Sequence, residues 1–316
     1  MSGPTVCVIA GGVGAAKLLA GIVRVVDPAA TTAVVNVGDD LVLHGLHISP
    51  DLDTITYTLA GRNDTATGWG LAGETWNAME TLGRYGGADW FSLGDHDLGT
   101  HLYRTQRLHE GARLSEVTGE ITRSWGLALE VLPATDDELR TMITLAEPAD
   151  ETPEVAFQEY FVRLRHEVAV TGVRFAGAGD ARPSPGVLDA IRRSDVVVVA
   201  PSNPIVSIGP VLAVPGIREA LEARRDDVVA VSPLIAGRAL KGPADRLMRE
   251  LGHEATATGV ARIYSAFAGT IVIDEEDASL AGEIAASGVR PVVAPTVMTD
   301  PSTAASLART VLGCDR

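Results

Sequence analysis

The N-terminal hydrophobic pattern changes from a short β-branched run to an apolar stripe with helical spacing. The run Thr5 to Ala10 is apolar on both faces, which predicts a buried strand of a parallel sheet. The stripe that follows predicts a helix and consists of Leu18, Leu19, Ile22 and Val23. A second strand is expected over Thr31 to Val37, so this part of the chain predicts a βαβ unit.

The same alternation returns in the C-terminal half, from Ser184 onward. Helices are expected over 185–193, 211–224, 244–251 and 303–312, and strands over 195–200, 227–231, 270–273 and 291–293. Strands that alternate with helices at this spacing are typical of an α/β fold. We therefore expect a single α/β domain over residues 1–316, with a Rossmann-like, doubly wound and mainly parallel sheet.

Residues 68–170 lack this alternation, which predicts a mostly helical accessory insertion within the domain. Helical spacing covers 74–82 and 98–108, while strand-like alternation covers 127–132 and 142–146. The two strand-like runs predict a small accessory sheet or an edge hairpin. The second helix carries a basic face that we expect to be solvated, made of Tyr103, Arg104, Arg107 and His109.

A glycine cluster follows the first predicted strand, in the segment Gly11-Gly12-Val13-Gly14-Ala15-Ala16-Lys17. Glycines at a strand-to-helix junction let backbone N–H groups approach an anion at the positive end of the helix. The segment fits neither common fingerprint, because Lys17 replaces the third glycine of a dinucleotide loop and lacks the neighbours of a P-loop lysine. It therefore indicates a phosphate-bearing ligand, and a tight turn without a ligand is the alternative.

Polar residues also end the second predicted strand, where Asn36, Asp39 and Asp40 occur close together. The carboxyl ends of neighbouring parallel strands flank the ligand crevice, so these side chains are expected near the glycine loop. One of them can hold a ribose hydroxyl or a metal ion. The alternative is a turn in which they bond only to the local backbone.

Two further pairs of acids are candidates for chemistry. Asp51 and Asp53 follow Ser49, the expected N-cap of a helix, and are suited to binding Mg²⁺ or accepting a hydroxyl proton. Their alternative role is to complement the helix dipole. Asp95 and Asp97 share one side of an extended loop and are suited to a divalent ion, with a turn and helix cap as the alternative.

A histidine metal site is not expected, because His96 and His101 are five residues apart and would not face one zinc ion from a helix. A second candidate ligand loop runs from Pro201 to Pro210, after the strand expected over 195–200. Its Ser and Asn side chains and unpaired N–H groups can cradle a phosphate or a base. A turn stiffened by its prolines is the alternative reading.

Composition narrows the class of protein. The chain of 316 residues is 46% hydrophobic, ample for a core, and its formal charge of -15 argues against a nucleic-acid partner. Cys7 and Cys314 form no disulfide framework or zinc spacing, so reduced thiols are expected. No signal-peptide pattern precedes the first strand and no apolar run reaches the roughly 18 residues of a membrane span, so we expect a cytoplasmic protein without membrane contact.

Five segments in this order closely resemble the 2-phospho-L-lactate transferase family, whose actinobacterial branch is called phosphoenolpyruvate transferase. They are the glycine segment 11–17, Ser-Pro-Asp-Leu-Asp-Thr at 49–54, Leu-Gly-Asp-His-Asp at 93–97, the loop 201–210 and Val-Ser-Pro-Leu-Ile at 231–235. The resemblance spans nearly the whole chain. The segments 49–54 and 201–210 are its most specific parts.

The resemblance implies a step in the biosynthesis of the deazaflavin coenzyme F-420. In that step the ribityl 5′-hydroxyl of 7,8-didemethyl-8-hydroxy-5-deazariboflavin attacks a guanosine diphosphate ester carrying lactate or enolpyruvate. GMP is released and a phosphodiester remains. The resemblance also implies small-molecule substrates, Mg²⁺ as the metal, a Rossmann-like core and a homodimer.

By the same resemblance, Asp53 matches a deazaflavin-contacting aspartate, and a second contact falls at Ser92, where the family often has Lys. That departure removes a charge. We expect Asp53 to orient or deprotonate the attacking hydroxyl and to help place Mg²⁺, with Asp95 and Asp97 as the other candidate metal ligands. The expected contacts of the guanosine diphosphate donor are Gly11, Gly12, Gly14, Lys17, Asn36, Ser202, Asn203, Ser207 and Gly209.

Two other functions fit parts of the pattern. An NAD(P)-dependent oxidoreductase would place Asp39 or Asp40 on the ribose, but its third loop glycine is missing. A non-catalytic sugar-nucleotide-binding regulator can be built on the same fold. The choice between a phospholactyl and a phosphoenolpyruvyl donor stays open, as does the aromatic that stacks on the deazaflavin among Trp69, Trp76, Trp90 and Phe91.

Overall fold

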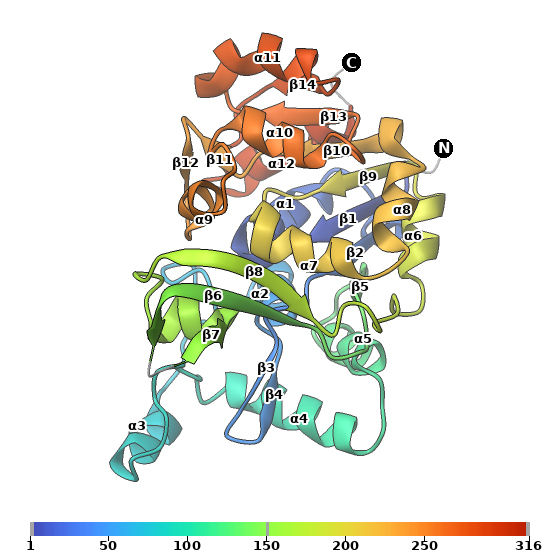
Figure 1. Cartoon of the computed structure of the whole chain (residues 1–316). Coiled ribbons are helices and arrows are strands. Elements are labelled where there is room, and N and C mark those ends of the chain that lie inside the picture. The colour runs from blue at the N-terminus through green and yellow to red at the C-terminus, as the bar shows by residue number, and fades with distance from the viewer. Residues whose placement is uncertain (1–2, 150–151, 314–316) are drawn as a thin grey trace.

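A seven-stranded sheet lies at the centre of the computed structural model, which describes residues 3–149 and 152–313 (Figure 1). Every neighbouring pair in this sheet is parallel, which confirms the expected α/β fold. In spatial order the strands are β14 (Arg290–Val293), β13 (Thr270–Ile273), β10 (Val228–Val231), β9 (Val196–Val199), β1 (Val6–Ala10), β2 (Thr31–Val35) and β5 (Glu130–Pro133).

The strand order reverses next to β1. From β1 the chain passes to β2 on one side, and the later strands β9, β10, β13 and β14 are added in turn on the other side. The switch point therefore lies between β1 and β9. In open parallel sheets, ligands bind beyond the carboxyl ends of the strands at this position.

Helices cover both faces of the sheet. On one side α1 (Gly12–Ile22) packs against α2 (Pro50–Leu59) and α12 (Pro301–Leu312). On the other side α6 (Val187–Arg193) packs against α8 (Ile217–Glu222). Right-handed crossovers require this arrangement, because the sheet grows in opposite directions from β1. The remaining helices of the C-terminal half are α9 (Ala244–Glu250), α10 (Ala257–Tyr264) and α11 (Ala281–Ala286).

The prediction of a single helix over 211–224 is wrong. Two short helices stand there, α7 (Gly209–Ala213) and α8, separated by Val214-Pro215-Gly216. Pro215 lacks the N–H that would continue the first helix, and Gly216 adopts a left-handed φ of 91° that favours glycine. The Pro-Gly pair was therefore the local signal for the break.

The region 68–170 contains helices α3 (Asn77–Arg84) and α4 (Asp97–His109), close to the two expected ranges, and a further helix, α5 (Leu114–Ser124). Just before it, β3 (Leu41–Leu43) and β4 (Leu46–Ile48) form a hairpin that packs on α4. The region is interrupted by β5, which pairs with β2 at the edge of the main sheet. The prediction that 127–132 belongs to an accessory sheet or hairpin is therefore wrong. This segment forms β5, which pairs in parallel with β2 in the main sheet.

A three-stranded antiparallel sheet does form from the rest of the region, as expected for 142–146. It consists of β7 (Thr152–Ala156), β6 (Arg140–Ala149) and β8 (Val170–Ala176). A short helical turn, Glu159–Arg163, follows β7. These elements share a second hydrophobic core with Val206 and Leu247, which fixes the accessory sheet beside the loop after β9. The hairpin of β11 (Leu234–Ile235) and β12 (Arg238–Ala239) completes the strands.

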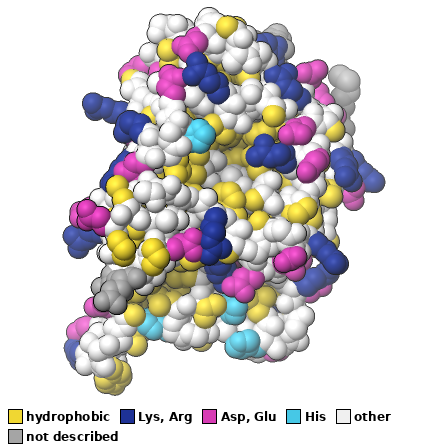
Figure 2. All heavy atoms as spheres, in the orientation of Figure 1, with side chains coloured by type: hydrophobic (Ala, Val, Ile, Leu, Met, Phe, Trp, Pro, Cys, Tyr) yellow, Lys and Arg dark blue, Asp and Glu magenta, His cyan; other side chains and the backbone are white. Residues whose placement is uncertain are grey.

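The surface carries mixed charges on the face seen in Figure 2, where Lys and Arg are scattered among Asp and Glu around a hydrophobic middle. Within the described ranges, no helix has the length and apolar character needed to span a bilayer. Cys7 is buried in β1 as a free thiol, while Cys314 lies outside the described residues.

The contact of α1 with α12 depends on Gly21, where an added Cβ would lie 2.2 Å from the carbonyl oxygen of Ala304. We expect Gly21→Ala to lower the free energy of unfolding by roughly 1–3 kcal/mol, because the two backbones must separate. Gly282→Ala in α11 is the matched control, since a Cβ there meets nothing within 4 Å. Urea denaturation of both variants tests this, and equal stabilities would contradict it.

Candidate active site

A cavity of about 670 Å³ lies beyond the carboxyl ends of β1 and β9, at the switch point of the sheet. Its size is typical of small-molecule sites. Its walls come from distant parts of the chain: the glycine loop, the start of α2, the loop after β9, the α3 and α4 region and the turn after β7. The cavity is therefore a product of the tertiary fold.

The glycine loop and the loop after β9 are held against each other on one wall. Ser202 Oγ donates to the carbonyl oxygen of Gly11 at 2.7 Å. At Gly14 an added Cβ would lie 2.4 Å from the carbonyl oxygen of Pro201, so a side chain there would separate the loops. The N-terminus of α1 begins at Gly12 and faces the cavity, which suits an anion.

Asp39 and Asp51 line the same end of the cavity as buried carboxyls. Burial raises the pKa of Asp51 to about 6, although hydrogen bonds from Asn36 and the Gly12 backbone act in the opposite direction. Burial, followed by the charge of Asp51, also raises the pKa of Asp39 well above its ordinary value. The two carboxyls therefore resist joint ionisation, and an added cation would relieve this.

Asn36 supports this wall from behind. Its Nδ2 donates to Asp51 Oδ2 at 3.0 Å, and its Oδ1 accepts the N–H of Gly38 at 2.8 Å. The side chain is fully buried and does not line the cavity. Asn36 was expected to contact the guanosine diphosphate substrate, but in this structure its side chain holds Asp51 in place.

A buried ion pair joins Asp53 and Arg104. Arg104 Nη1 donates to Asp53 Oδ2 at 3.1 Å, and Nη2 donates to Asp53 Oδ1. Arg104 is only 2% exposed, so the expectation that it belongs to a solvated basic face was wrong. The sequence signal for its burial was the helical spacing of Asp97, His101 and Arg104, which places all three side chains on one face of α4.

Asp97 and His101 extend this cluster. His101 Nε2 lies 3.3 Å from Asp97 Oδ2, and its Nδ1 lies 3.7 Å from Asp53 Oδ2. Tyr57 donates its hydroxyl to Asp97 Oδ1 at 2.6 Å. Burial acts to raise the pKa of Asp97, but the hydrogen bond and charge of His101, with the Tyr57 hydroxyl, lower it overall.

Asp53, Asp97 and His101 each offer a ligand atom, and these atoms lie within 4.8 Å of one another. Two carboxylates with an imidazole can hold a divalent cation. The candidate group therefore includes a histidine, although the sequence led us to expect no histidine metal site. His101 enters it through its i, i+4 spacing from Asp97, and His96 is not part of it.

Asp95 does not join this group. Its carboxylate accepts hydrogen bonds from Thr75 Oγ1 at 2.5 Å, from Asn77 Nδ2 at 2.8 Å and from the Ala78 N–H at 3.1 Å, so it caps α3. Ser49 precedes α2 as expected, but its hydroxyl does not cap the helix and instead donates to Asp40 Oδ2 at 2.6 Å. These two polar side chains have structural roles.

Aromatic side chains also line the cavity: Trp69, Trp90, Phe91, Phe157 and Phe161. The rings of Phe157 and Phe161 are stacked, with centroids 5.5 Å apart. Ser92 lines the cavity too. Trp76 meets Trp69 edge-on and does not reach the cavity. The lining therefore combines acidic and polar groups with aromatic rings that suit a planar ring system.

The remaining expected donor contacts divide into two groups. Ser202, Asn203 and Ser207 line the cavity, although Asn203 Oδ1 also accepts the N–H of Ile205 at 2.9 Å. Gly209 and Lys17 do not line it. Gly209 lies behind Phe175, and Lys17 points away and donates to the carbonyl oxygen of Met298 at 3.1 Å.

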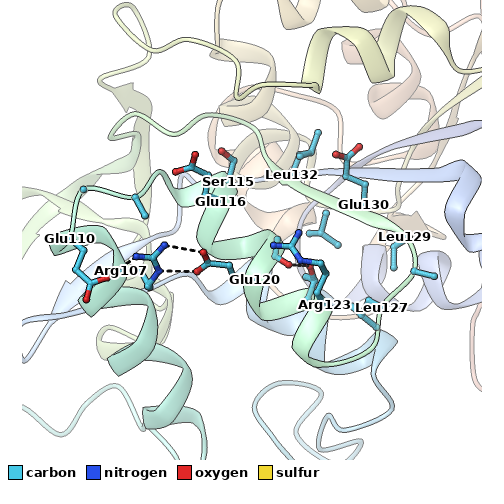
Figure 3. Close-up of a pocket in the computed structure, with 16 residues that line it drawn as sticks. Arg107, Glu110, Ser115, Glu116, Glu120, Arg123, Leu127, Leu129, Glu130 and Leu132 are labelled. Atoms are coloured by element: carbon cyan, nitrogen blue, oxygen red, sulfur yellow. Dashed lines mark hydrogen bonds and ion pairs between the residues drawn. The ribbon is translucent and has the colours of Figure 1, made fainter.

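A second cavity of about 750 Å³ lies between α4, α5 and β5 (Figure 3). Its charged side chains are largely paired with one another: Arg107 donates to both carboxylate oxygens of Glu120 at 3.0 Å and to Glu110 at 2.7 Å. None of the residues expected from the sequence to bind substrate lines it. We therefore assign the functional site to the cavity at the switch point.

Comparison with known proteins gives a family match over nearly the whole chain. A family model described as "2-phospho-L-lactate transferase CofD" matches residues 6–303. A phosphoenolpyruvate transferase of Nocardia farcinica is 44% identical over 314 residues, covering 98% of this chain and 95% of that protein. The proteins of that name from Mycolicibacterium smegmatis and Streptomyces griseus are each 42% identical, covering 96% and 97% of this chain and the same shares of their own lengths.

Solved structures give the same fold at lower sequence identity. A UPF0052 family protein from Bacillus halodurans superposes with a TM-score of 0.66 and 20% identity, covering 99% of this chain and 100% of that chain. At this identity the likeness supports the fold alone.

The ion pair of Asp53 and Arg104 leads to a stability prediction. Arg104→Met should lower the free energy of unfolding by roughly 3–5 kcal/mol, because Asp53 would stay buried without its partner. Arg107→Met is the matched control on the same helix, and it should lose clearly less stability, since Arg107 is 30% exposed and its ion pairs are only partly buried. Urea denaturation measures both, and similar losses would contradict the prediction.

Asp40 provides a pH-dependent test. Burial raises its pKa from 3.8 to about 7, so the folded state holds this proton more tightly than the unfolded state. The contribution of Asp40 to stability therefore falls as the pH rises through that interval. Asp40→Asn should raise the melting temperature by a few degrees at pH 8 and by clearly less at pH 5, measured by circular dichroism. A gain that is the same at both pH values would exclude this origin.

Proposed function

Because this chain belongs to the 2-phospho-L-lactate transferase CofD family, we propose that it transfers a phosphoenolpyruvyl group from a guanosine diphosphate ester to a deazaflavin. Family membership makes it a transferase of coenzyme F-420 biosynthesis that acts on a phospholactyl or phosphoenolpyruvyl group. The choice of the enolpyruvyl group rests on the relatives named phosphoenolpyruvate transferase. The acceptor is the ribityl 5′-hydroxyl of 7,8-didemethyl-8-hydroxy-5-deazariboflavin, and GMP leaves.

The observation that carries the proposal is that one cavity is lined by two kinds of group. The N-terminus of α1 and the loop after β9 line it, and their backbone N–H groups suit a diphosphate. Trp69, Trp90 and Phe91 line it as well, and a planar deazaflavin can lie against such aromatic rings. Asp53 lines the same cavity, where the donor and the acceptor would meet.

In the proposed reaction the 5′-oxygen of the acceptor forms a bond to the phosphorus that carries the enolpyruvyl group. The bond from this phosphorus to the GMP oxygen breaks, and GMP leaves with the electron pair. Asp53 accepts a hydrogen bond from the attacking hydroxyl, orients its oxygen and takes its proton as the new bond to phosphorus forms, while Arg104 keeps the carboxylate in place. Ser92 lines the same cavity and is the proposed second contact of the deazaflavin.

Mg²⁺ is the metal we propose for this site. Asp53 and Asp97 would hold it with His101, the three groups whose ligand atoms converge. When bound, the ion supplies positive charge to the diphosphate oxygens, which phosphoryl transfer requires. The homodimer implied by the family resemblance stays a prediction.

The reaction itself is tested by the mass of the product. Purified protein with Mg²⁺, the deazaflavin and the enolpyruvyl ester of guanosine diphosphate should give GMP and the enolpyruvyl phosphodiester, while the lactyl ester should give less product. Titration with GDP and with NADH separates this function from an oxidoreductase. Binding of NADH with no GMP formation would overturn the proposal.

The role of Asp53 is tested against a matched acid that lies outside the cluster. Asp53→Asn should lower kcat at least roughly 100-fold at saturating Mg²⁺, because the hydroxyl loses its orienting carboxylate. Asp95→Asn should keep kcat within about threefold of wild type, since Asp95 caps α3. Near-normal turnover of Asp53→Asn would exclude the role, and an equal loss in both variants would return Asp95 to the metal site.

A further inference from the structure

Among the described residues, one Lys or Arg side chain lines the cavity, and it belongs to a segment that the sequence analysis did not identify. Lys241 follows β12 and stands with Gly242 and Pro243 on the cavity wall. Its Nζ donates to the carbonyl oxygen of Thr67 at 3.2 Å, so it meets the segment 67–70 that carries Trp69.

The charge balance of the cavity makes this cation significant. Four carboxyls line the wall: Asp39, Asp51, Asp53 and Asp97. Arg104 neutralises Asp53 from behind the wall and does not line it, and Lys17 points away toward Met298. An anionic donor that enters this cavity therefore meets only one positively charged Lys or Arg side chain among the described residues.

Lys241 is also available to bind. Its side chain is exposed and makes no ion pair with any residue in the described ranges, and its ammonium has three donors, of which the Thr67 carbonyl takes one. Gly68 lies beside the ammonium, since an added Cβ there would be 2.6 Å from Nζ. The left-handed φ of 80° at this position favours glycine.

We propose that Lys241 binds the anionic donor through its ammonium, which pairs with a phosphate or carboxylate oxygen of the nucleoside diphosphate ester. This inference rests on the proposed function. The ammonium exchanges its weak contact with the neutral Thr67 carbonyl for a charge-assisted hydrogen bond. Lys241 thereby offsets the repulsion between the donor and the acidic wall, and it is a binding residue that takes no part in proton transfer.

The test compares Lys241→Gln with Lys241→Arg and with Arg238→Gln. Arg238 is exposed on the same hairpin and does not line the cavity, so its loss controls for a change in net charge. Lys241→Gln should raise the KM for the donor roughly 10- to 100-fold, the range of one charge-assisted hydrogen bond, and leave the KM for the deazaflavin within about twofold. Lys241→Arg should recover most of the donor affinity, and Arg238→Gln should match wild type.

Calorimetric titration with GDP in the presence of Mg²⁺ identifies the atoms that Lys241 contacts, because GDP lacks the carboxylate of the ester. Weaker GDP binding by Lys241→Gln assigns the contact to a phosphate, whereas unchanged GDP binding with a raised donor KM assigns it to the carboxylate. If Lys241 contacts a phosphate, added NaCl should also lower the GDP affinity of wild type more steeply than that of Lys241→Gln.

Unchanged GDP affinity together with an unchanged donor KM in Lys241→Gln overturns the inference. Such a result leaves the proposed function intact if wild type still releases GMP. Failure of wild type to form product overturns the proposed function instead, and the GDP titration then still decides whether Lys241 binds a nucleoside diphosphate. Melting temperatures close to wild type exclude misfolding as the cause of any loss.

Discussion

The buried ion pair between Asp53 and Arg104 connects the two parts of this molecule. Asp53 lies in the first turn of α2, which packs on α1, and Arg104 lies on α4 of the inserted region. A guanidinium at 2% exposure is stable only with a partner of opposite charge and good geometry, so this pair fixes where α4 can sit. The position of α4 then brings Asp97 and His101 to Asp53.

The second constraint is the close approach of the loops after β1 and β9. Gly14 allows contact with the Pro201 carbonyl, and Ser202 bonds to the Gly11 carbonyl. The glycine loop after β1 departs from the common phosphate-binding fingerprints in part because of its contact with the loop after β9. Its glycines allow loop packing as well as ligand access. Lys17, which replaces a third glycine, lies on the outer side of α1.

The cavity is lined by both acidic and aromatic side chains, and this combination accounts for the kind of chemistry it suits. Buried carboxyls such as Asp39 and Asp51 disfavour a polyanion unless cations accompany it. A divalent ion at Asp53, Asp97 and His101 and the ammonium of Lys241 are the two sources of positive charge in the proposal. The aromatic rings need no charge and can hold a neutral ring system.

The sequence by itself determined the α/β class, most of the strands and helices, the glycine loop and the family. These follow from local periodicity and from motifs whose residues are close in the chain. Only the tertiary structure decided that Arg104 is buried on Asp53, that Asp95 caps α3, that β5 joins the main sheet, and that Lys241 lines the cavity while Lys17 does not. The reason is physical: the partner of a charge or of a strand edge is set by packing between segments 20 to 191 residues apart, as in the contacts of Asp95 with Thr75 and of Ser202 with Gly11, and no local pattern specifies such pairs.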